Sequence, residues 1–267
     1  MKGRVLIVAG SDSGGGAGIQ ADIKAVTALG GFAATAITAL TAQNTLGVHG
    51  VVSVDPAFCV QQMRVVLDDI GADCLKTGML HTPAIIDAVA DTIETAAAGI
   101  PLVVDPVMVA KGGAKLLDDS AHDALVRRLL PLATVLTPNA PEAEALTGIA
   151  VIDPDSQRAA GEALVAAGAK AVLVKGGHVA GDIIVDLLVS ADGIERFEGP
   201  RVPTAHTHGT GCTLASSIAA GLAQRMSLHD AVARARAYVL AAIRSAPGYG
   251  HGHGPLDHGV TVRPLEY

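Results

Sequence analysis

The chain has 267 residues and a formal net charge of −7; half of its residues are hydrophobic, 17% are charged and 2% are aromatic. This composition argues against a nucleic-acid surface, which needs a basic face and usually stacking rings. No uncharged apolar run reaches the roughly 18 residues of a membrane span, so no membrane partner is expected. We expect a single domain over residues 1–267, because α/β domains of this length are common.

The three cysteines, Cys59, Cys74 and Cys212, are odd in number and widely spaced. This pattern fits neither a disulfide framework nor a zinc site, and it indicates a reducing compartment. The apolar run near the N-terminus is too short for a signal peptide and is typical of a first strand. We therefore expect a cytoplasmic location.

Strand and helix patterns alternate along the chain. Apolar, β-branched runs predict strands at 5–9, 32–41, 73–78, 101–105, 134–139 and 171–177. Helical spacing predicts helices at 17–30, after Asp55-Pro56, from Thr82-Pro83, after 206–211 and from Leu228. Residues 182–199 predict a β-hairpin with Asp192-Gly193 as its turn.

This alternation predicts βαβ units and the α/β class, with a mostly parallel central sheet between two helical layers. In such sheets ligands bind beyond the carboxyl ends of the strands. The polar residues that end the predicted strands are therefore the candidates for a functional site.

The stretch "AGSDSGGGAG" joins the first strand to the first helix. It lacks the third glycine of a dinucleotide fingerprint, since Ile19 stands there, and the chain contains no Gly-Lys pair of a phosphate loop. A flexible turn and a ligand-binding loop both remain open for this stretch.

The stretch "THGTGC" precedes a helical pattern and is more informative. Gly209, Thr210 and Gly211 would let the first-turn N–H groups and the helix dipole bind an anion, such as a phosphate. Cys212 stands in that field, where the pKa of a thiol can fall below its usual value of about 8.5. Its thiolate would then accept a proton from a substrate hydroxyl. The alternative for Cys212 is a small buried residue without chemistry.

Two further signals stand where a strand gives way to a helix or a loop. Asn139 and Glu142, in "TPNAPEAEAL", offer oxygen ligands for a hydrated Mg²⁺, or form a helix cap. Asp105 and Lys175 end two other strands; they suit Mg²⁺ and nucleotide phosphates, or form a strand-end salt bridge. Gln43, in "TAQNT", can donate to and accept from a heterocycle edge, or belong to a polar turn. Together these residues suggest phosphoryl transfer.

The same residues also lie in an ordered set of motifs. They are "AGSDSGGGAGIQADIK", "TALTAQNTLGV", "KTGML", "DPVMVAKGG", "LTPNAPEAEAL", "VKGGH", "THGTGCTLAS" and "GHGPLDH". The set covers Ala9 to His258 and resembles the hydroxymethylpyrimidine/phosphomethylpyrimidine kinases of thiamine biosynthesis. The resemblance implies a ribokinase-like fold, a three-layer α/β/α sandwich.

The resemblance implies that ATP and Mg²⁺ are used to phosphorylate 4-amino-5-hydroxymethyl-2-methylpyrimidine and then its monophosphate. It implies a homodimer as well. Gly209, Thr210 and Gly211 would form the anion hole, and Cys212 would replace the aspartate base of related sugar kinases. The substrate pocket would be formed by Gly10, Asp22, Gln43, Met79 and Val107. The nucleotide site would be formed by Asp105, Asn139, Glu142, Lys175, Thr207 and His208, with Glu142 and Asp105 at the metal.

Three points stay open at this stage. A vitamin B6 kinase acting on pyridoxal or pyridoxine, and a non-catalytic nucleotide-binding regulator, are the alternative functions. His206 stands where the family pattern leads us to expect Asn, and the loops near Gly14 and Gly112 are candidates for closing over the site. His251, His253 and His258 allow a metal site, but a solvated glycine-rich tail explains them more simply.

Overall fold

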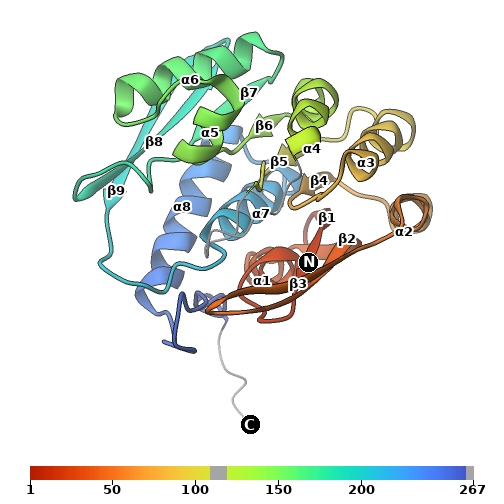
Figure 1. Ribbon diagram of the computed structural model, residues 1–267, viewed down its shortest axis with the longest axis horizontal. Helices are drawn as coiled ribbons and strands as arrows, with labels where there is room; N and C mark the ends of the chain where they lie inside the picture. Colours follow the sequence, from red (N-terminus) through yellow and green to blue (C-terminus); the bar gives the residue numbers. More distant parts are fainter. Residues whose placement is uncertain (109–118, 263–267) are drawn as a thin grey trace.

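One nine-stranded sheet runs through the part of the chain that the structure describes (Figure 1). The structure is a computed structural model and describes residues 1–108 and 119–262. The strands are β1 (Arg4–Asp12), β2 (Phe32–Asn44), β3 (Gly47–Ser53), β4 (Cys74–Thr77), β5 (Leu102–Val104), β6 (Val135–Leu136), β7 (Ala171–Val174), β8 (Ile183–Ser190) and β9 (Gly193–Pro200). The α-helices are α1 (Gly18–Ala28), α2 (Pro56–Asp69), α3 (Pro83–Ala96), α4 (Asp119–Ala124), α5 (Ala140–Thr147), α6 (Pro154–Ala166), α7 (Thr210–Ala223) and α8 (Leu228–Arg244).

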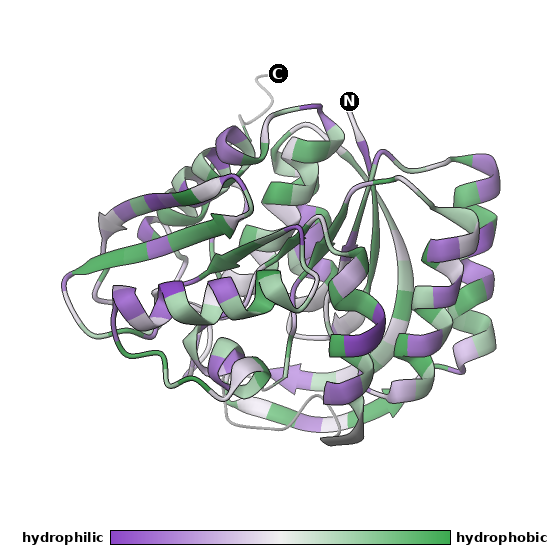
Figure 2. Cartoon of the chain, turned by 90° about the horizontal axis from the view of Figure 1, so that it is seen from above, coloured by the Kyte–Doolittle hydropathy of each residue, from purple (hydrophilic) through white to green (hydrophobic). Residues whose placement is uncertain are grey.

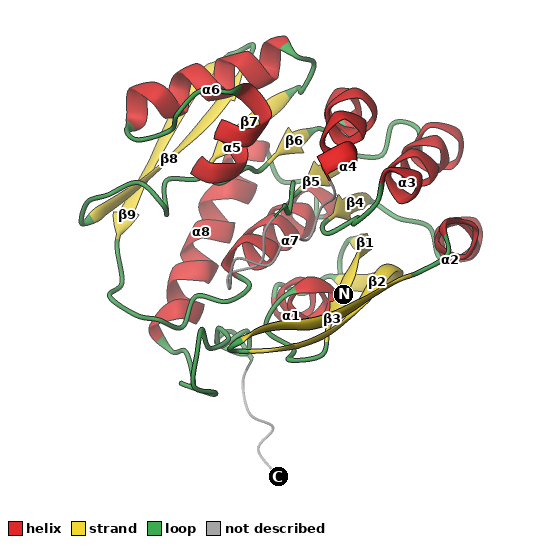
Figure 3. Ribbon diagram, in the orientation of Figure 1, coloured by secondary structure: helices red, strands yellow, loops and turns green. Residues whose placement is uncertain are grey.

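The strand order is β3-β2-β1-β4-β5-β6-β7-β8-β9. The six central strands, β2, β1, β4, β5, β6 and β7, pair in parallel with one another. The strands β3, β8 and β9 pair antiparallel at the two edges of the sheet. The predicted α/β class with a mostly parallel central sheet is therefore confirmed. Figure 3 shows the strands between the helices.

Each face of the sheet supports its own hydrophobic core. Leu6 and Val8 of β1 pack in a cluster with residues of α2, α3 and α6. Val5 and Ile7, which alternate with them, pack in a second cluster with residues of α1, α7 and α8. Because successive side chains of a strand point to opposite faces, this alternation requires helices on both sides. Figure 2 shows hydrophobic residues concentrated on the central strands and polar residues on the outer faces of the helices.

Local sequence signals explain several helix starts. Asp55 accepts backbone N–H groups at the start of α2, and Thr82 does so at the start of α3, each followed by a proline in the first turn. These are the side chain and the proline that helix starts favour, because they satisfy or remove unpaired N–H groups. Both predicted helix starts are confirmed.

Three predictions of elements need correction. Strand β2 continues to Asn44, so Gln43 lies inside a strand rather than in a turn after it. The short edge strand β3 was not predicted, because its residues "GVHGVVS" carry two glycines and a histidine. The β8–β9 loop consists of Ala191 and Asp192, since Ser190 pairs with Gly193. The turn was thus predicted one residue too late. Among the described residues, no helix combines the length and the apolar character that crossing a membrane would need.

Candidate active site

The carboxyl ends of the parallel strands bring the predicted charged residues together. Asp105 directly follows β5, and Lys175 directly follows β7, where it forms an isolated parallel bridge with Asn139. The start of α7 meets them, since a Cβ added to Gly211 would lie 3.2 Å from Lys175 Nζ and 3.7 Å from Asp105 Oδ2. We call Asp105, Glu142, Lys175 and Gly211 the charged side of the site.

Lys175 lies between two carboxylates on this side. Its Nζ is 3.2 Å from Asp105 Oδ1 and 4.0 Å from Glu142 Oε2. Burial opposes the charge of the ammonium, but Asp105 and Glu142 outweigh it and raise the pKa of Lys175. Burial also raises the pKa of Glu142 to about 7, although Lys175 opposes this shift. The charged side therefore carries a fixed cation in surroundings that contain little water, where electrostatic effects are strong.

Asn139 and Glu142 form a reciprocal cap at the start of α5. The Glu142 N–H donates to Asn139 Oδ1 at 2.9 Å, and the Asn139 N–H donates to Glu142 Oε2 at 2.8 Å. Asn139 and Glu142 thus form the helix cap that was one of the two predicted roles, and their role in binding Mg²⁺ stays a prediction. No cluster of three or more His, Cys, Asp and Glu within the described ranges could hold a metal. The residues present suit a Mg²⁺ that takes most of its ligands from phosphates and water, as Mg²⁺ usually does.

The two glycines at the start of α7 are required for different structural reasons. Gly209 has a φ of 81°, and a Cβ added there would overlap the carbonyl oxygen of Gly16 in the β1–α1 loop. Gly211 instead faces Lys175 and Asp105. No side chain caps the N-terminus of α7, so its first-turn N–H groups remain suited to a ligand anion. At the start of α7, Gly209 is therefore required by close packing, whereas Gly211 leaves room for an anion beside Lys175.

Cys212 differs from its expectation. Burial raises the pKa of its thiol to about 12, even though the positive charge of Lys76 lowers it. The prediction that the helix N-terminus leaves this thiol with a lowered pKa is wrong in this structure. Desolvation of the thiolate outweighs the helix dipole here. The role of Cys212 as a base stays a prediction.

A second group of predicted residues packs around Met79. We define the apolar side of the site as Gly10, Met79 and Val107, together with Gln43, whose amide contacts His208. A Cβ added to Gly10 would lie 3.1 Å from Met79 Sδ, and Met79 packs in one cluster with Val107. Asp22 is the remaining residue that the resemblance adds to this pocket, and its role there stays a prediction. Its carboxylate is fully buried and pairs with Lys76.

His208 connects this apolar side to the glycine-rich loop. Its Nε2 lies 2.9 Å from Asp12 Oδ2 and 3.2 Å from Gln43 Nε2. The resemblance implies a nucleotide role for His208, whereas the structure places it beside the apolar side. Thr207, the other such residue, accepts the Thr210 hydroxyl through its carbonyl oxygen at 2.7 Å, next to the start of α7.

Comparisons with known proteins identify the family of this chain. The family described as phosphomethylpyrimidine kinase matches residues 12–257. The chain belongs to this family. It is 48% identical to the hydroxymethylpyrimidine/phosphomethylpyrimidine kinase of Streptomyces coelicolor, over 97% of this chain and 95% of that protein. It is 52% identical to the thiamine biosynthesis bifunctional protein ThiED of Geobacter sulfurreducens, over 96% of this chain but about half (52%) of that protein's length.

Solved structures of two vitamin kinases share the fold of this family member. The phosphomethylpyrimidine kinase of Clostridium difficile superimposes with a TM-score of 0.81 and 39% identity, over 91% of this chain and 100% of that chain. The pyridoxal kinase of Staphylococcus aureus, solved in complex with ADP, gives a TM-score of 0.91 and 34% identity, over 98% of this chain and 96% of that chain. The predicted ribokinase-like fold and kinase class are confirmed, while shape alone does not separate the two substrates.

Two functional candidates of this phosphomethylpyrimidine kinase family member were missed from its sequence. Asp12 accepts the N–H groups of Gly14, Gly16 and Ala17 at 2.8–3.0 Å, so the glycine-rich loop is ordered by one carboxylate. An Asp ahead of three glycines is a known turn signal that pointed to it. Lys76 is fully buried in β4, and a lone lysine within an apolar strand signals a buried partner.

The C-terminal segment, which we define as residues 250–258, is not a solvated tail. Side chains added to Gly250, Gly252 and Gly254 would overlap Thr45 or His206, so the alternating glycines let this segment pack closely. His258 is buried, with its Nε2 2.9 Å from Thr213 Oγ1. Its histidines form no metal cluster within the described ranges. Gly112 lies outside the described residues.

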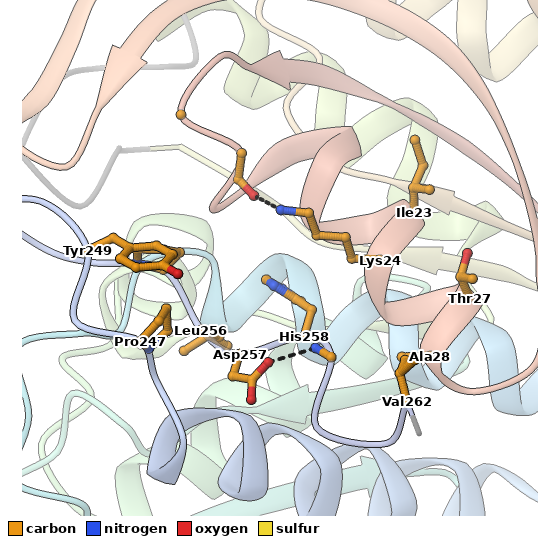
Figure 4. A pocket seen from close by; sticks show the side chains of 14 residues that line it. Ile23, Lys24, Thr27, Ala28, Pro247, Tyr249, Leu256, Asp257, His258 and Val262 are labelled. Carbon is orange, nitrogen blue, oxygen red and sulfur yellow. Dashed lines mark hydrogen bonds between the residues drawn. The ribbon is translucent and has the colours of Figure 1, made fainter. Parts of the chain in front are cut away.

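A cavity of about 570 Å³ lies between α1 and this segment (Figure 4). Lys24 and Thr27 of α1 face Tyr249, Asp257 and His258 across it. Gly14 and His258 line this cavity, but none of the residues predicted for the substrate pocket, the nucleotide site or the anion hole does. It is therefore separate from the charged and apolar sides described above.

Proposed function

We propose that this chain transfers the γ-phosphoryl group of ATP to the hydroxymethyl group of 4-amino-5-hydroxymethyl-2-methylpyrimidine, and then to the resulting monophosphate, in thiamine biosynthesis. The observation that carries the proposal is the charged side, where Lys175 and Asp105 lie next to the start of α7, the turn that contains Cys212. Relatives named for both phosphorylations are 46–48% identical over 94–98% of their own length, which supports the same substrate.

In this proposal one bond forms as another breaks. The substrate hydroxyl oxygen forms a bond to the γ-phosphorus, while the bond from that phosphorus to the bridging oxygen of ADP breaks. The ammonium of Lys175 and the N–H groups at the start of α7 stabilise the charge on the transferring group. Bound Mg²⁺, held by Asp105 and Glu142, would neutralise phosphate charge. Gln43 would hold the pyrimidine edge against Met79 and Val107.

The proton of the hydroxyl remains to be placed. Its acceptor in our proposal is the thiolate of Cys212, which forms when the thiol loses its own proton to water; the raised pKa of the thiol makes this the minor form. Phosphoryl transfer passes through a loose transition state, so positioning and electrostatic stabilisation dominate and the alcohol gains acidity only as its bond to phosphorus forms. A thiol with a raised pKa therefore limits the rate of phosphoryl transfer only weakly.

The test is a coupled ATPase assay on a panel of hydroxymethyl heterocycles. We expect kcat/KM for the hydroxymethylpyrimidine to exceed that for pyridoxal by more than about tenfold, a difference of 1.4 kcal/mol in transition-state binding. A preference for pyridoxal would favour the second candidate, a vitamin B6 kinase, which the similarity to the Staphylococcus aureus enzyme keeps open. No turnover of any heterocycle would favour a non-catalytic regulator. The homodimer and the cytoplasmic location stay predictions.

A further inference from the structure

The proposed reaction leaves a buried ion pair beneath Cys212 without a role. Lys76 of β4 and Asp22 of α1 have fully buried side chains, and Lys76 Nζ lies 2.9 Å from each carboxylate oxygen of Asp22. Taking two charges out of water is costly, and apolar residues of the same size often serve stability as well. A retained pair at this position therefore calls for a functional reason.

The pair stands where α1 and α7 meet. Cys212 lies in the first turn of α7, on the same helix face as Ser216 four residues later, and Gly18 begins α1. One turn further along each helix, Ser216 Oγ donates to Asp22 Oδ1 at 2.6 Å. The same carboxylate thus ties α7 to α1 directly behind the reactive sulfur, and Lys76 supports it from the sheet.

The ammonium of Lys76 is also confined. A Cβ added to Gly78 would lie 2.9 Å from Lys76 Nζ, so the ammonium occupies the space that a side chain at position 78 would fill. Burial opposes its charge, but Asp22 and then Cys212 and Asp105 outweigh that and raise the pKa of Lys76. The negative charges around Lys76 therefore favour its charged form.

Charged groups from four elements act on Cys212. Lys76 of β4 favours the thiolate and is the largest of the charge effects on it, whereas Asp22 of α1 and Asp105 after β5 oppose the thiolate. Lys175, after β7, also interacts with the sulfur and favours the thiolate. Lys76 and Asp22 thus have opposite effects on the pKa of Cys212, and the proposed reaction gives neither effect a role.

We propose that Lys76 is a positioning residue that supplies the positive counter-charge to the Cys212 sulfur, with Asp22 holding the ammonium in place and partly cancelling its charge. The inference rests on the proposed function only in taking Cys212 as the reacting residue. Asp22 then acts through Lys76 and Ser216 rather than by lining the substrate pocket.

The test measures how fast iodoacetamide alkylates Cys212 between pH 7 and 10, in the full-length protein without substrate, with the modified peptide identified by mass spectrometry. Asp22→Asn leaves the Lys76 charge uncancelled, so we expect alkylation at a fixed pH to accelerate about tenfold, the change that one pKa unit gives. The double variant Asp22→Asn/Lys76→Met removes both charges at nearly constant volume. We expect it to lose that acceleration.

Two controls separate electrostatics from loosening of the fold. Asp73→Asn removes a carboxylate that pairs with Arg4 at the surface, and it should leave Cys212 alkylation unchanged. Alkylation of the buried Cys59 should stay negligible in every variant, since its rise would report opening of the core. If Lys76→Met alone fails to fold, the double variant still gives the comparison, because it leaves no unpaired charge.

An unchanged alkylation rate in Asp22→Asn would overturn the inference. So would an acceleration that persists in the double variant, since it could not come from Lys76. Kinase assays on the same proteins keep this question apart from the proposed function: loss of activity on every heterocycle in the wild-type enzyme would refute the function, whatever the alkylation rates are.

Discussion

The two sides of the active site differ in what holds them together. The charged side joins Asp105, Glu142 and Lys175, three residues from distant parts of the chain, through ion-pair contacts of 3.2 and 4.0 Å. The apolar side relies on close packing around Met79, with Gln43 as its polar group. Charges suit the stabilisation of a transition state, whereas a fitted apolar surface with one amide suits recognition of a ring. Substitutions on the charged side should therefore change kcat, and those on the apolar side should change KM.

The largest expected effect is at Cys212, next to the charged side. Cys212→Ala should lower kcat by about 10²–10⁴-fold, the usual contribution of a positioned proton acceptor, while KM changes little. Steady-state kinetics with both substrates varied measures this. Cys59→Ala is the control, because it removes a thiol that is buried in the core away from the site. Activity of Cys212→Ala within about threefold of the wild type would exclude the sulfur as the base.

The next effect concerns the junction of the two sides, where Gly209 of α7 meets Gly16 of the β1–α1 loop. Gly209→Ala introduces a Cβ at a φ of 81° and against the Gly16 carbonyl oxygen. We expect a loss of more than about 2 kcal/mol in the free energy of unfolding, from backbone strain and the overlap together. Urea denaturation measures it. Gly47→Ala is the control, since nothing lies within 4 Å of its added Cβ. Equal losses in both variants would contradict the packing reason for Gly209.

A third prediction tests how the C-terminal segment supports the charged side through His258. Burial lowers the pKa of this histidine to about 4 from an ordinary 6.5, and the nearby Lys24 adds to the shift. An unfolded chain therefore binds a proton here at a higher pH than the folded one does. The stabilising contribution is complete above pH 6.5 and is lost as the pH falls through 4, by about 3 kcal/mol.

Urea denaturation at pH 7 and at pH 4.5 checks this. The fall in the free energy of unfolding between the two values should be smaller by about 2 kcal/mol in His258→Asn than in the wild type, since the titrating group is gone. His251→Asn, which changes an exposed ring in the same segment, should behave like the wild type. An unchanged pH dependence in His258→Asn would show that this ring is charged, or exposed, in the folded protein.

How far the sequence could predict this molecule follows the same division. Periodicity and glycine or proline signals suffice for the parallel sheet and for the placing of Asp105, Asn139 and Lys175 at one edge, because parallel strands end at the same edge. The raised pKa of Cys212 was not accessible in this way. It depends on how much water reaches the sulfur and on Lys76 and Asp22, which stand 136 and 190 residues earlier in the chain.

Residues that bond across the fold were misplaced for a similar reason. His208 lies in a motif next to the anion site, and only the tertiary structure reveals its contacts with Asp12 and Gln43. The alternating glycines of the C-terminal segment looked like a flexible tail, because Thr45, against which Gly250 and Gly252 pack, is about 200 residues away in the sequence. Local patterns predict elements and edges, whereas burial and long-range partners decide what each polar group does.

The smallest expected effect is on the apolar side, at Gln43. Removing its amide in Gln43→Ala should raise the KM for the pyrimidine about tenfold, because one or two hydrogen bonds to the ring are worth about 1.4 kcal/mol. The KM for ATP should not change, since the phosphates bind at the charged side. Gln62→Ala is the control; its amide bonds to Ile37 of the same strand, away from the carboxyl end. Equal increases in both KM values would remove Gln43 from the substrate pocket and, with it, the division of the site into a recognising and a reacting side.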